Sequence, residues 1–187
     1  LTISHGDNDH IGGAKSILSS INVAKVITSV PERFKPPATE CHDGITFVWD
    51  GVSFRFMSPP RGDHLVGNDK SCVLKVTNGQ NSVLLTGDIE LAAESYLLQK
   101  HAKDLAANIL LVPHHGSKTS SSDPFLDAVR PEYAIFSTGY LNSYQHPHKI
   151  VIDRYLRHNV RVFNTVSSGA IIMTIPADSA IVQVEEY

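Results

Sequence analysis

The chain has 187 residues, of which 42% are hydrophobic, so one domain can bury a continuous core without disulfides or metal ions as braces. Its formal net charge of −3 excludes a general electrostatic attraction to nucleic acid, so contact with a polyanion must be local. No apolar run reaches the roughly 18 residues that a membrane-spanning helix needs. We expect a single domain over residues 1–187.

The first half of the chain predicts one helix among short strands. Leu1–Ile3 is typical of the end of a strand, and Ile11–Val23 predicts a helix whose apolar residues share one buried face. Asp50-Gly51 and Asn78-Gly79 are typical hairpin turns. The strands expected here are Val26–Val30, Ile45–Trp49, Ser53–Ser58, Ser71–Thr77 and Ser82–Thr86.

In the second half, strands and helices alternate. Helices are expected at Glu90–Ala102, Pro124–Val129 and Lys149–His158. Strands are expected at Ile109–Val112, Tyr133–Ser137, Val160–Asn164, Gly169–Ile175 and Ala180–Val184. Hairpins together with strand–helix alternation favour an α/β (α+β) architecture in which helices cover the outer faces of sheets.

Cysteine usage gives little information. Cys41 and Cys72 have neither the spacing of a metal site nor the number needed for a disulfide framework. We expect two ordinary buried or half-buried thiols, which leave the redox compartment undecided.

Histidine usage is more informative, because six of the ten histidines lie in three short stretches. Three apolar strands run into His5, Asp88 and His115, and ligands at strand ends can converge. Imidazoles and carboxylates hold zinc or manganese, and two such ions can clamp a phosphate ester. The alternative for the first stretch is a solvated loop in which Asp9 caps the next helix. Four potential ligands within six residues favour a metal site over that alternative.

These clusters carry a resemblance. The run His5-x-Asp7-x-Asp9-His10, the strand end Thr86-Gly87-Asp88 and the turn Pro113-His114-His115-Gly116-Ser117 resemble the metallo-β-lactamase superfamily. The usual signature of that superfamily is His-x-His-x-Asp-His, so Asp7 stands where a histidine is expected. An extra carboxylate favours manganese or magnesium over a purely zinc-selective pair. The resemblance implies an αβ/βα four-layer sandwich with the metal site at one edge, between two sheets.

Further matches narrow the resemblance. Asn68-Asp69-Lys70-Ser71, His146-Pro147-His148 and Asn164-Thr165 follow in order along the chain, which resembles the C-terminal domain of the ComEC family of competence DNA-uptake proteins. The same pattern is similar to secreted phosphorylcholine esterases and other phosphodiesterases. The resemblance also implies opening strands upstream of the first cluster, and those strands are missing here.

The resemblance implies two divalent metal ions, Mn²⁺ or Zn²⁺, and no small organic cofactor. His5 and Asp7 would bind one ion, Asp9, His10 and His115 the other, and Asp88 would bridge them, with His114 as a further candidate ligand. The superfamily often supplies another histidine before the bridging aspartate, but His42 and His64 lie in loops and neither is expected to be a ligand.

The implied catalytic roles fall on a few more residues. Asp9 or Asp69 would align the attacking hydroxide, and His146 would protonate the leaving alkoxide or contact the phosphate. Asn68 and Ser71 are expected to bind substrate, although a loop and the start of a strand would explain them as well. The other substrate-binding candidates are Ser117, Lys118 and Asn142. Arg154 and Arg157 share a helix face, which is either a solvated surface or a modest phosphate-tracking patch.

Three functions remain open. The first is a nuclease that cleaves DNA phosphodiesters during DNA uptake. The second is a small-molecule phosphodiesterase, in which Trp49, Tyr140 or Tyr144 would hold a cationic headgroup. The third is a non-catalytic module.

The implied setting is a longer protein. We expect a domain of a bacterial inner-membrane protein, on the extracytoplasmic side, that works with DNA and with a membrane channel region of the same polypeptide. The missing strands lead us to expect self-association through an exposed edge strand.

Overall fold

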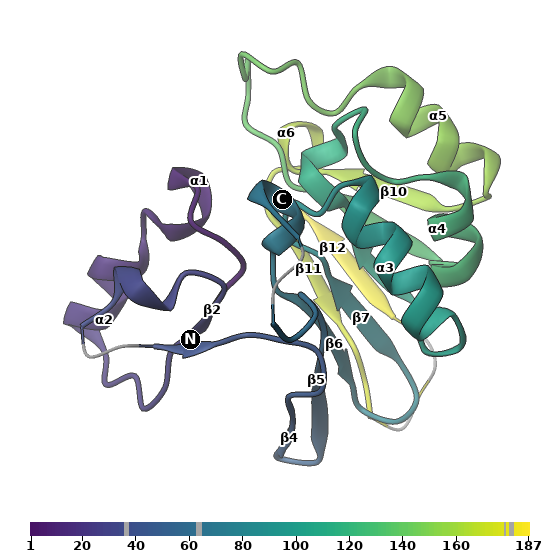
Figure 1. The fold of residues 1–187 in the computed structure, drawn as a ribbon. Helices are drawn as coiled ribbons and strands as arrows, with labels where there is room; N and C mark the ends of the chain where they lie inside the picture. The colour runs from purple at the N-terminus through teal and green to yellow at the C-terminus, as the bar shows by residue number, and fades with distance from the viewer. Residues whose placement is uncertain (36–37, 63–64, 178, 180–181) are drawn as a thin grey trace.

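The largest sheet forms the centre of the molecule. The computed structural model describes residues 1–35, 38–62, 65–177, 179 and 182–187 (Figure 1). The sheet has seven strands in the order β10-β9-β8-β7-β6-β5-β4, in which each strand from β5 to β10 pairs with its predecessor in the chain. Their bounds are β4 Thr46–Trp49, β5 Val52–Ser58, β6 Val73–Thr77, β7 Ser82–Leu85, β8 Ile109–Leu111, β9 Tyr133–Phe136 and β10 Arg161–Asn164.

The direction of pairing changes at β7. Strands β4 to β7 are antiparallel neighbours, and β7 to β10 are parallel neighbours joined through helices. The predicted hairpins are thus confirmed, and both residues of the Asp50-Gly51 turn have positive φ, at 49° and 78°. Such a turn matches the twist of the flanking strands, which explains the choice of glycine.

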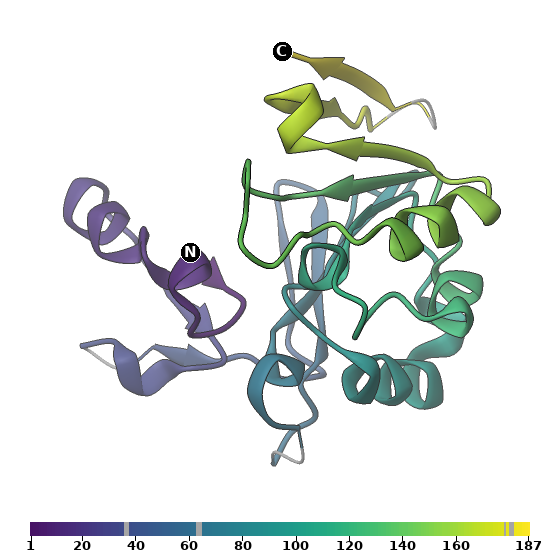
Figure 2. The same cartoon turned by 90° about the horizontal axis from the view of Figure 1, so that it is seen from above.

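Three helices cover one face of this sheet, as Figure 2 shows: α3 (Leu91–His101), α4 (Asp123–Val129) and α5 (Lys149–Arg157). Because successive side chains of a strand point to opposite faces, Leu84, Leu110 and Ala134 meet the helices, and all three are fully buried. This is the main hydrophobic core of the described residues.

The opposite face is covered by the antiparallel pair β11 (Ile171–Thr174) and β12 (Gln183–Glu186). Met173 and Val184 pack there against a cluster that contains Ile109 and Tyr133. The last strand was predicted at Ala180–Val184. It begins at Gln183 instead, and Ala180 and Ile181 lie outside the described residues.

A small parallel sheet of two-residue strands lies beside β5 and β6: β1 (Thr2–Ile3), β2 (Ile27–Thr28) and β3 (Thr39–Glu40), in that order. Ile27 packs with Phe56 and Leu74 of the large sheet. In the same cluster Cys41 and Cys72 form a disulfide, with Cα atoms 5.9 Å apart. The prediction of two thiols was therefore wrong. The cysteines are 31 residues apart in the chain, and the local sequence does not show that the two sheets that carry them pack together.

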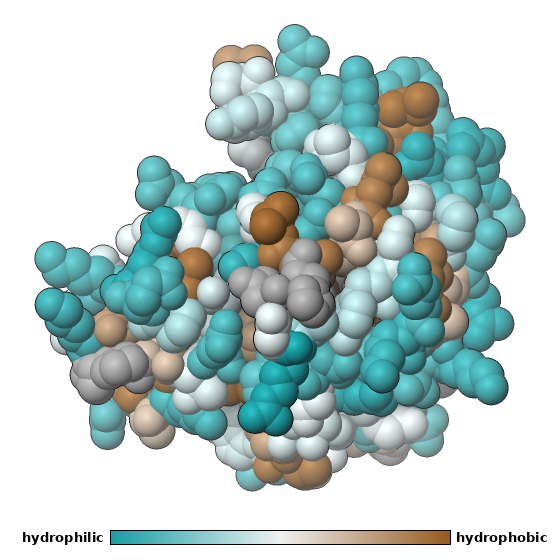
Figure 3. Space-filling view, in the orientation of Figure 1, coloured by the Kyte–Doolittle hydropathy of each residue, from teal (hydrophilic) through white to brown (hydrophobic). Residues whose placement is uncertain are grey.

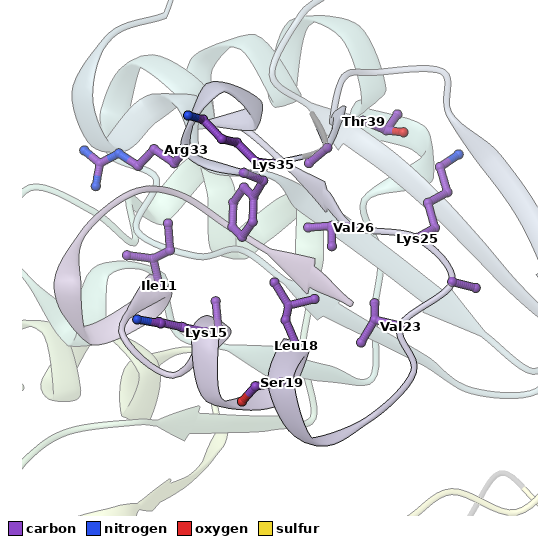
Figure 4. Close-up of a pocket in the computed structure, with 14 residues that line it drawn as sticks. Ile11, Lys15, Leu18, Ser19, Val23, Lys25, Val26, Arg33, Lys35 and Thr39 are labelled. Atoms are coloured by element: carbon purple, nitrogen blue, oxygen red, sulfur yellow. The ribbon is translucent and has the colours of Figure 1, made fainter.

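The predicted helix Ile11–Val23 is also wrong in part. It is two helices, α1 (Asn8–Ile11) and α2 (Ala14–Ser20), separated at Gly12 and Gly13, because glycine is a poor helix former. The expected buried face does not form: Ile21 is 61% exposed, and Leu18 points from α2 toward Val26 across an open pocket of about 680 Å³ (Figure 4).

Strand β4 is the outer edge of the large sheet. Its side chains Phe47, Val48 and Trp49 are all exposed, and hydrophobic atoms appear where this hairpin ends in Figure 3. An exposed apolar edge is the feature on which the predicted self-association depends. No helix among the described residues combines the length and the hydropathy needed to cross a membrane.

The remaining elements are short and had not been predicted. They are the 3-10 helices η1 (Pro31–Arg33), η2 (Gly67–Lys70), η3 (Ala102–Asp104) and η4 (Pro113–Gly116), and α6 (Thr165–Ser168). Because η4 directly follows β8, it lies at the sheet edge where the predicted ligands of three strands meet.

Candidate metal centre

Four side chains from three strand ends form a compact group. Asp9 and His10 lie on α1, Asp88 follows β7, and His115 lies in η4. One ligand atom of each lies within 4.8 Å of the others. The N-cap of α1 is Asp7 rather than Asp9, so Asp9 does not fill the capping role that was its alternative explanation. The predicted convergence of strand ends is therefore present in the structure.

The distances within this group fit a metal ion. His10 Nε2 lies 3.2 Å from Asp88 Oδ1, and His115 Nε2 lies 3.2 Å from Asp9 Oδ2 and 3.4 Å from Asp88 Oδ2. The two Nε2 atoms of His10 and His115 are 3.2 Å apart. Two ligands about 2.1 Å from one ion, at a tetrahedral angle, lie about 3.4 Å from each other. The spacing of donors is thus that of ligands around a common centre.

His5 and Asp7 lie beside the group. His5 Nε2 is 3.6 Å from Asp7 Oδ2 and 3.8 Å from Asp88 Oδ2. That nitrogen is buried and has no hydrogen-bond partner among the described residues. A buried polar atom without a partner is costly, and a cation bound to it would remove the cost. Asp88 therefore stands between two sets of donors.

Hydrogen bonds outside the group orient the imidazoles. Ser4 Oγ lies 3.1 Å from His5 Nδ1 and 3.0 Å from His10 Nδ1, and His115 Nδ1 donates to the Ser137 carbonyl at 2.6 Å. When Nδ1 carries the proton, Nε2 is left free to bind a metal. Ser4 was not among the residues predicted for the site, and its orienting role follows from these contacts.

Replacing Ser4 by alanine is expected to weaken metal binding by roughly 10- to 100-fold, because both rings lose the partner that fixes their tautomer. Competition with a chromophoric chelator measures the dissociation constant. Ser16→Ala on the exposed side of α2 is the matched control. Equal affinity in Ser4→Ala and wild type would contradict the orienting role.

Burial and neighbouring groups shift the pKa values of Asp88, His115 and His5. Burial acts to raise the pKa of Asp88, but hydrogen bonds from His10 and His115 outweigh it and hold that pKa well below its ordinary range. The hydrogen bond with Asp88 raises the pKa of His115 to about 9, although burial opposes the change. Burial lowers the pKa of His5, and His10 acts in the same direction.

The two adjacent histidines separate at a sharp turn. His114 and His115 have φ of 47° and 53°, and Gly116 follows with φ of 82°. His114 Nδ1 faces Glu90 Oε1 at 3.1 Å instead of the group. The turn sends neighbouring rings in different directions: His115 is inside the group and His114 is outside it, so we do not include His114 among the proposed ligands.

Two residues predicted to act on substrate instead support the framework. Asp69 Oδ1 accepts hydrogen bonds from the backbone N–H groups of Glu90 and Ala93, at 2.7 and 2.9 Å, and so caps α3. Ser71 Oγ accepts from the Asp88 N–H at 3.1 Å and positions that loop. Both residues are buried and hydrogen-bonded within the framework, and the catalytic role expected for Asp69 and the substrate contact expected for Ser71 stay predictions.

The remaining candidates for substrate binding are dispersed. Ser117 is buried and its hydroxyl lies 2.9 Å from that of Thr119, so it stabilises its own loop. Lys118 is exposed. It lines neither the pocket that contains Asp9 and His115 nor the pocket that contains His5 and Asp7. Asn68 Nδ2 lies 3.5 Å from His114 Nε2. Arg154 donates to the Ser120 carbonyl, so part of the predicted arginine face supports a loop.

One pocket opens on the group, and another opens on His5 and Asp7 beside it. The first, of about 560 Å³, contains Asp9 and His115 and extends to Asn142, Tyr144 and His146. The other, of about 360 Å³, contains His5, Asp7 and Asn68, together with Arg33. Arg33 was not predicted; its guanidinium donates to the Gly6 carbonyl at 2.8 Å. Trp49 and Tyr140 line neither pocket, so of the aromatic candidates only Tyr144 is near the site.

His146 is held beside the group. Burial lowers its pKa, with the neighbouring charge of His114 acting in the same direction. Its buried Nδ1 has no partner among the described residues. A neutral ring donates one hydrogen bond, which favours contact with a phosphate over proton donation.

Comparison with known proteins is consistent with this site. The family model described as "Metallo-beta-lactamase superfamily" matches residues 1–140. Competence protein ComA of Neisseria gonorrhoeae is 40% identical over 171 residues, which is 91% of this chain and 24% of that protein. Recombination protein 2 of Haemophilus influenzae is 40% identical over 172 residues, 91% of this chain and 21% of that protein. The chain thus spans about a quarter or less of these relatives.

Among solved structures, the metallo-beta-lactamase fold protein YhfI of Bacillus subtilis has a TM-score of 0.50 at 11% identity, over 87% of this chain and 72% of that one. At this identity the likeness concerns the fold alone. Together with the family match it confirms the predicted fold class.

Proposed function

Because this chain belongs to the metallo-beta-lactamase superfamily, whose members are metal-dependent hydrolases, we propose that it is a metal-dependent nuclease that cleaves DNA phosphodiesters during DNA uptake. The observation that carries the proposal is the group Asp9, His10, Asp88 and His115, on which a pocket of about 560 Å³ opens at Asp9 and His115. A second pocket contains His5 and Asp7, so a polymeric substrate has a further surface beside the same donors. The competence and recombination proteins among the relatives support a role in DNA uptake.

The donor sets suggest two divalent ions. His5 and Asp7 would hold one, Asp9, His10 and His115 the other, and the two oxygens of Asp88 face both sets. Divalent ions bound there would supply Lewis acidity to a phosphoryl oxygen and acidify water. With three carboxylates in the donor set, manganese suits the site at least as well as zinc.

The protein's own residues then position the reactants. Asp9 keeps 62% of its side chain exposed at the pocket, where its carboxylate can accept a hydrogen bond from an attacking water. His146 can donate a hydrogen bond to a phosphate oxygen. Arg33 lies in the second pocket, beside Asp7, and brings positive charge to that side.

The disulfide supports the predicted location. Disulfides persist in oxidising compartments and are rare in the reducing cytosol, so Cys41–Cys72 favours the extracytoplasmic side of the membrane. The greater length of the relatives leaves room for the proposed membrane channel region in the same polypeptide.

A cleavage assay with Mn²⁺ tests the function. Wild type is expected to cleave DNA oligonucleotides, and Asp7→Ala to lose roughly 100-fold or more in rate, because one donor set loses its carboxylate. Asp127→Ala on α4, an equally exposed aspartate outside the site, is the matched control.

Other outcomes identify the alternatives. Intact DNA together with rapid cleavage of a phosphorylcholine ester would show the small-molecule phosphodiesterase. Less than one ion per chain by mass spectrometry after metal supplementation would indicate a non-catalytic module.

A further inference from the structure

One pocket of the metal centre has a wall in which His146 alone has a role in the proposed hydrolytic chemistry. It contains Asp9 and His115 of the centre, and the loop of residues 138–146 supplies Thr138, Gly139, Asn142, Tyr144 and His146. Its volume of about 560 Å³ is in the range of pockets that hold small organic groups. The loop thus offers a second binding surface beside the reacting phosphate.

Tyr144 is the large exposed aromatic side chain of that surface. It is 74% exposed, and its ring lies nearly parallel to that of His146, with centroids 5.8 Å apart and an angle of 16°. His146 is itself braced edge-on by His148 at 5.0 Å and by His114 at 5.7 Å. The tyrosine ring is therefore supported on its His146 side and has open surface elsewhere.

The loop that carries this ring is fixed in place. Asn142 Nδ2 donates to the carbonyls of Gly139 and His146, at 2.9 and 2.7 Å, and Asn142 Oδ1 accepts from the His146 N–H at 2.8 Å. This explains Asn142 as a positioning residue. A platform fixed before binding costs little conformational entropy when a ligand arrives.

The composition of the pocket narrows the ligand class. No lysine or arginine is among its described lining residues, so this pocket offers no positive side chain to the phosphates of a nucleic-acid backbone. Tyr144 is also the one tyrosine, tryptophan or phenylalanine of that lining, whereas cages for quaternary ammonium groups use several aromatic rings. One flat exposed ring next to a phosphate-binding centre suits stacking with a nucleobase.

We propose that Tyr144, backed by His146, stacks on the base of a nucleotide adjacent to the cleaved phosphodiester, so that the site selects nucleic acid with unstacked bases. The inference rests on the proposed nuclease function. A base inside a duplex is stacked on both sides and cannot offer its face to Tyr144. Single strands and frayed ends are therefore the preferred substrates.

Tyr144→Ala in the Mn²⁺-loaded protein tests the platform. On a single-stranded oligonucleotide KM is expected to rise about tenfold, the loss of one stacked base, while kcat changes less than about twofold. Tyr144→Phe should restore the wild-type KM, because stacking needs the ring and not the hydroxyl. Tyr140→Ala is the matched control: Tyr140 is 79% exposed nearby in the chain but does not line the pocket.

A series of oligonucleotides with one abasic position provides a second readout. At the position that contacts Tyr144, removal of the base should raise KM for wild type, and Tyr144→Ala should add no further rise. An unchanged KM in Tyr144→Ala, a fall in kcat that phenylalanine does not restore, or a preference for blunt duplex would overturn the proposal. If wild type cleaves phosphorylcholine esters and no DNA, the nuclease function itself fails, and this inference with it.

Discussion

Replacing Asp88 by asparagine is expected to lower kcat/KM on any phosphodiester that the protein cleaves by about 1000-fold or more, since several kcal/mol of charge stabilisation depend on the bound ions. Asp88 Oδ1 faces His10, and Oδ2 faces both His5 and His115. Asparagine preserves the shape but removes the negative charge and one oxygen. Both donor sets lose their shared ligand in this single change.

Metal content and activity must change together. Mass spectrometry of Asp88→Asn after supplementation is expected to find fewer bound ions than in wild type, and the cleavage assay to follow. Asp127→Asn controls for the chemical change on the surface of α4. Circular dichroism separates loss of the site from loss of the fold. A variant that keeps full metal content and full activity would refute the central position of Asp88.

Removal of the disulfide is expected to have the largest effect on stability. Cys41→Ser with Cys72→Ser should lower the free energy of unfolding by about 3.5 kcal/mol, the chain-entropy value for a loop of this size. The two cysteines are 31 residues apart and both are buried, at 0% and 3% exposure. Serine would also place hydroxyl groups in the apolar cluster around Ile27.

Denaturant unfolding with and without a reductant measures this effect. The reductant should lower the midpoint of wild type and leave the double variant unchanged. A wild-type midpoint that does not respond to complete reduction would show that the bond contributes nothing.

Much of the site could be predicted from the sequence, because the metal-type residues follow apolar strands directly. His5, Asp88 and His115 each come a few residues after a strand that the pattern of hydrophobicity identifies. His5 follows a strand of the small sheet, and Asp88 and His115 follow neighbouring strands of the large one, so the site lies where strand ends of two packed sheets meet. The helices α3, α4 and α5 were predicted for a similar local reason, since their apolar residues recur with helical spacing.

The errors concern properties that local patterns do not contain. Cys41 and Cys72 meet only because the small sheet packs against the large one. Asp69 was assigned a catalytic role from the resemblance, and local patterns do not show that its carboxylate caps a helix that begins 22 residues later, at Leu91. The different directions of His114 and His115 depend on two residues with positive φ, which the sequence does not specify.

The consecutive order of the large sheet has a consequence for how the chain folds. Each strand from β5 to β10 pairs with the strand before it, so the sheet can grow in the order of synthesis, starting from the β4–β5 hairpin. Contacts between near neighbours in the chain form quickly. The contact between His10 and His115 joins residues 105 positions apart, so the metal centre is expected to assemble last, on a sheet that is already complete.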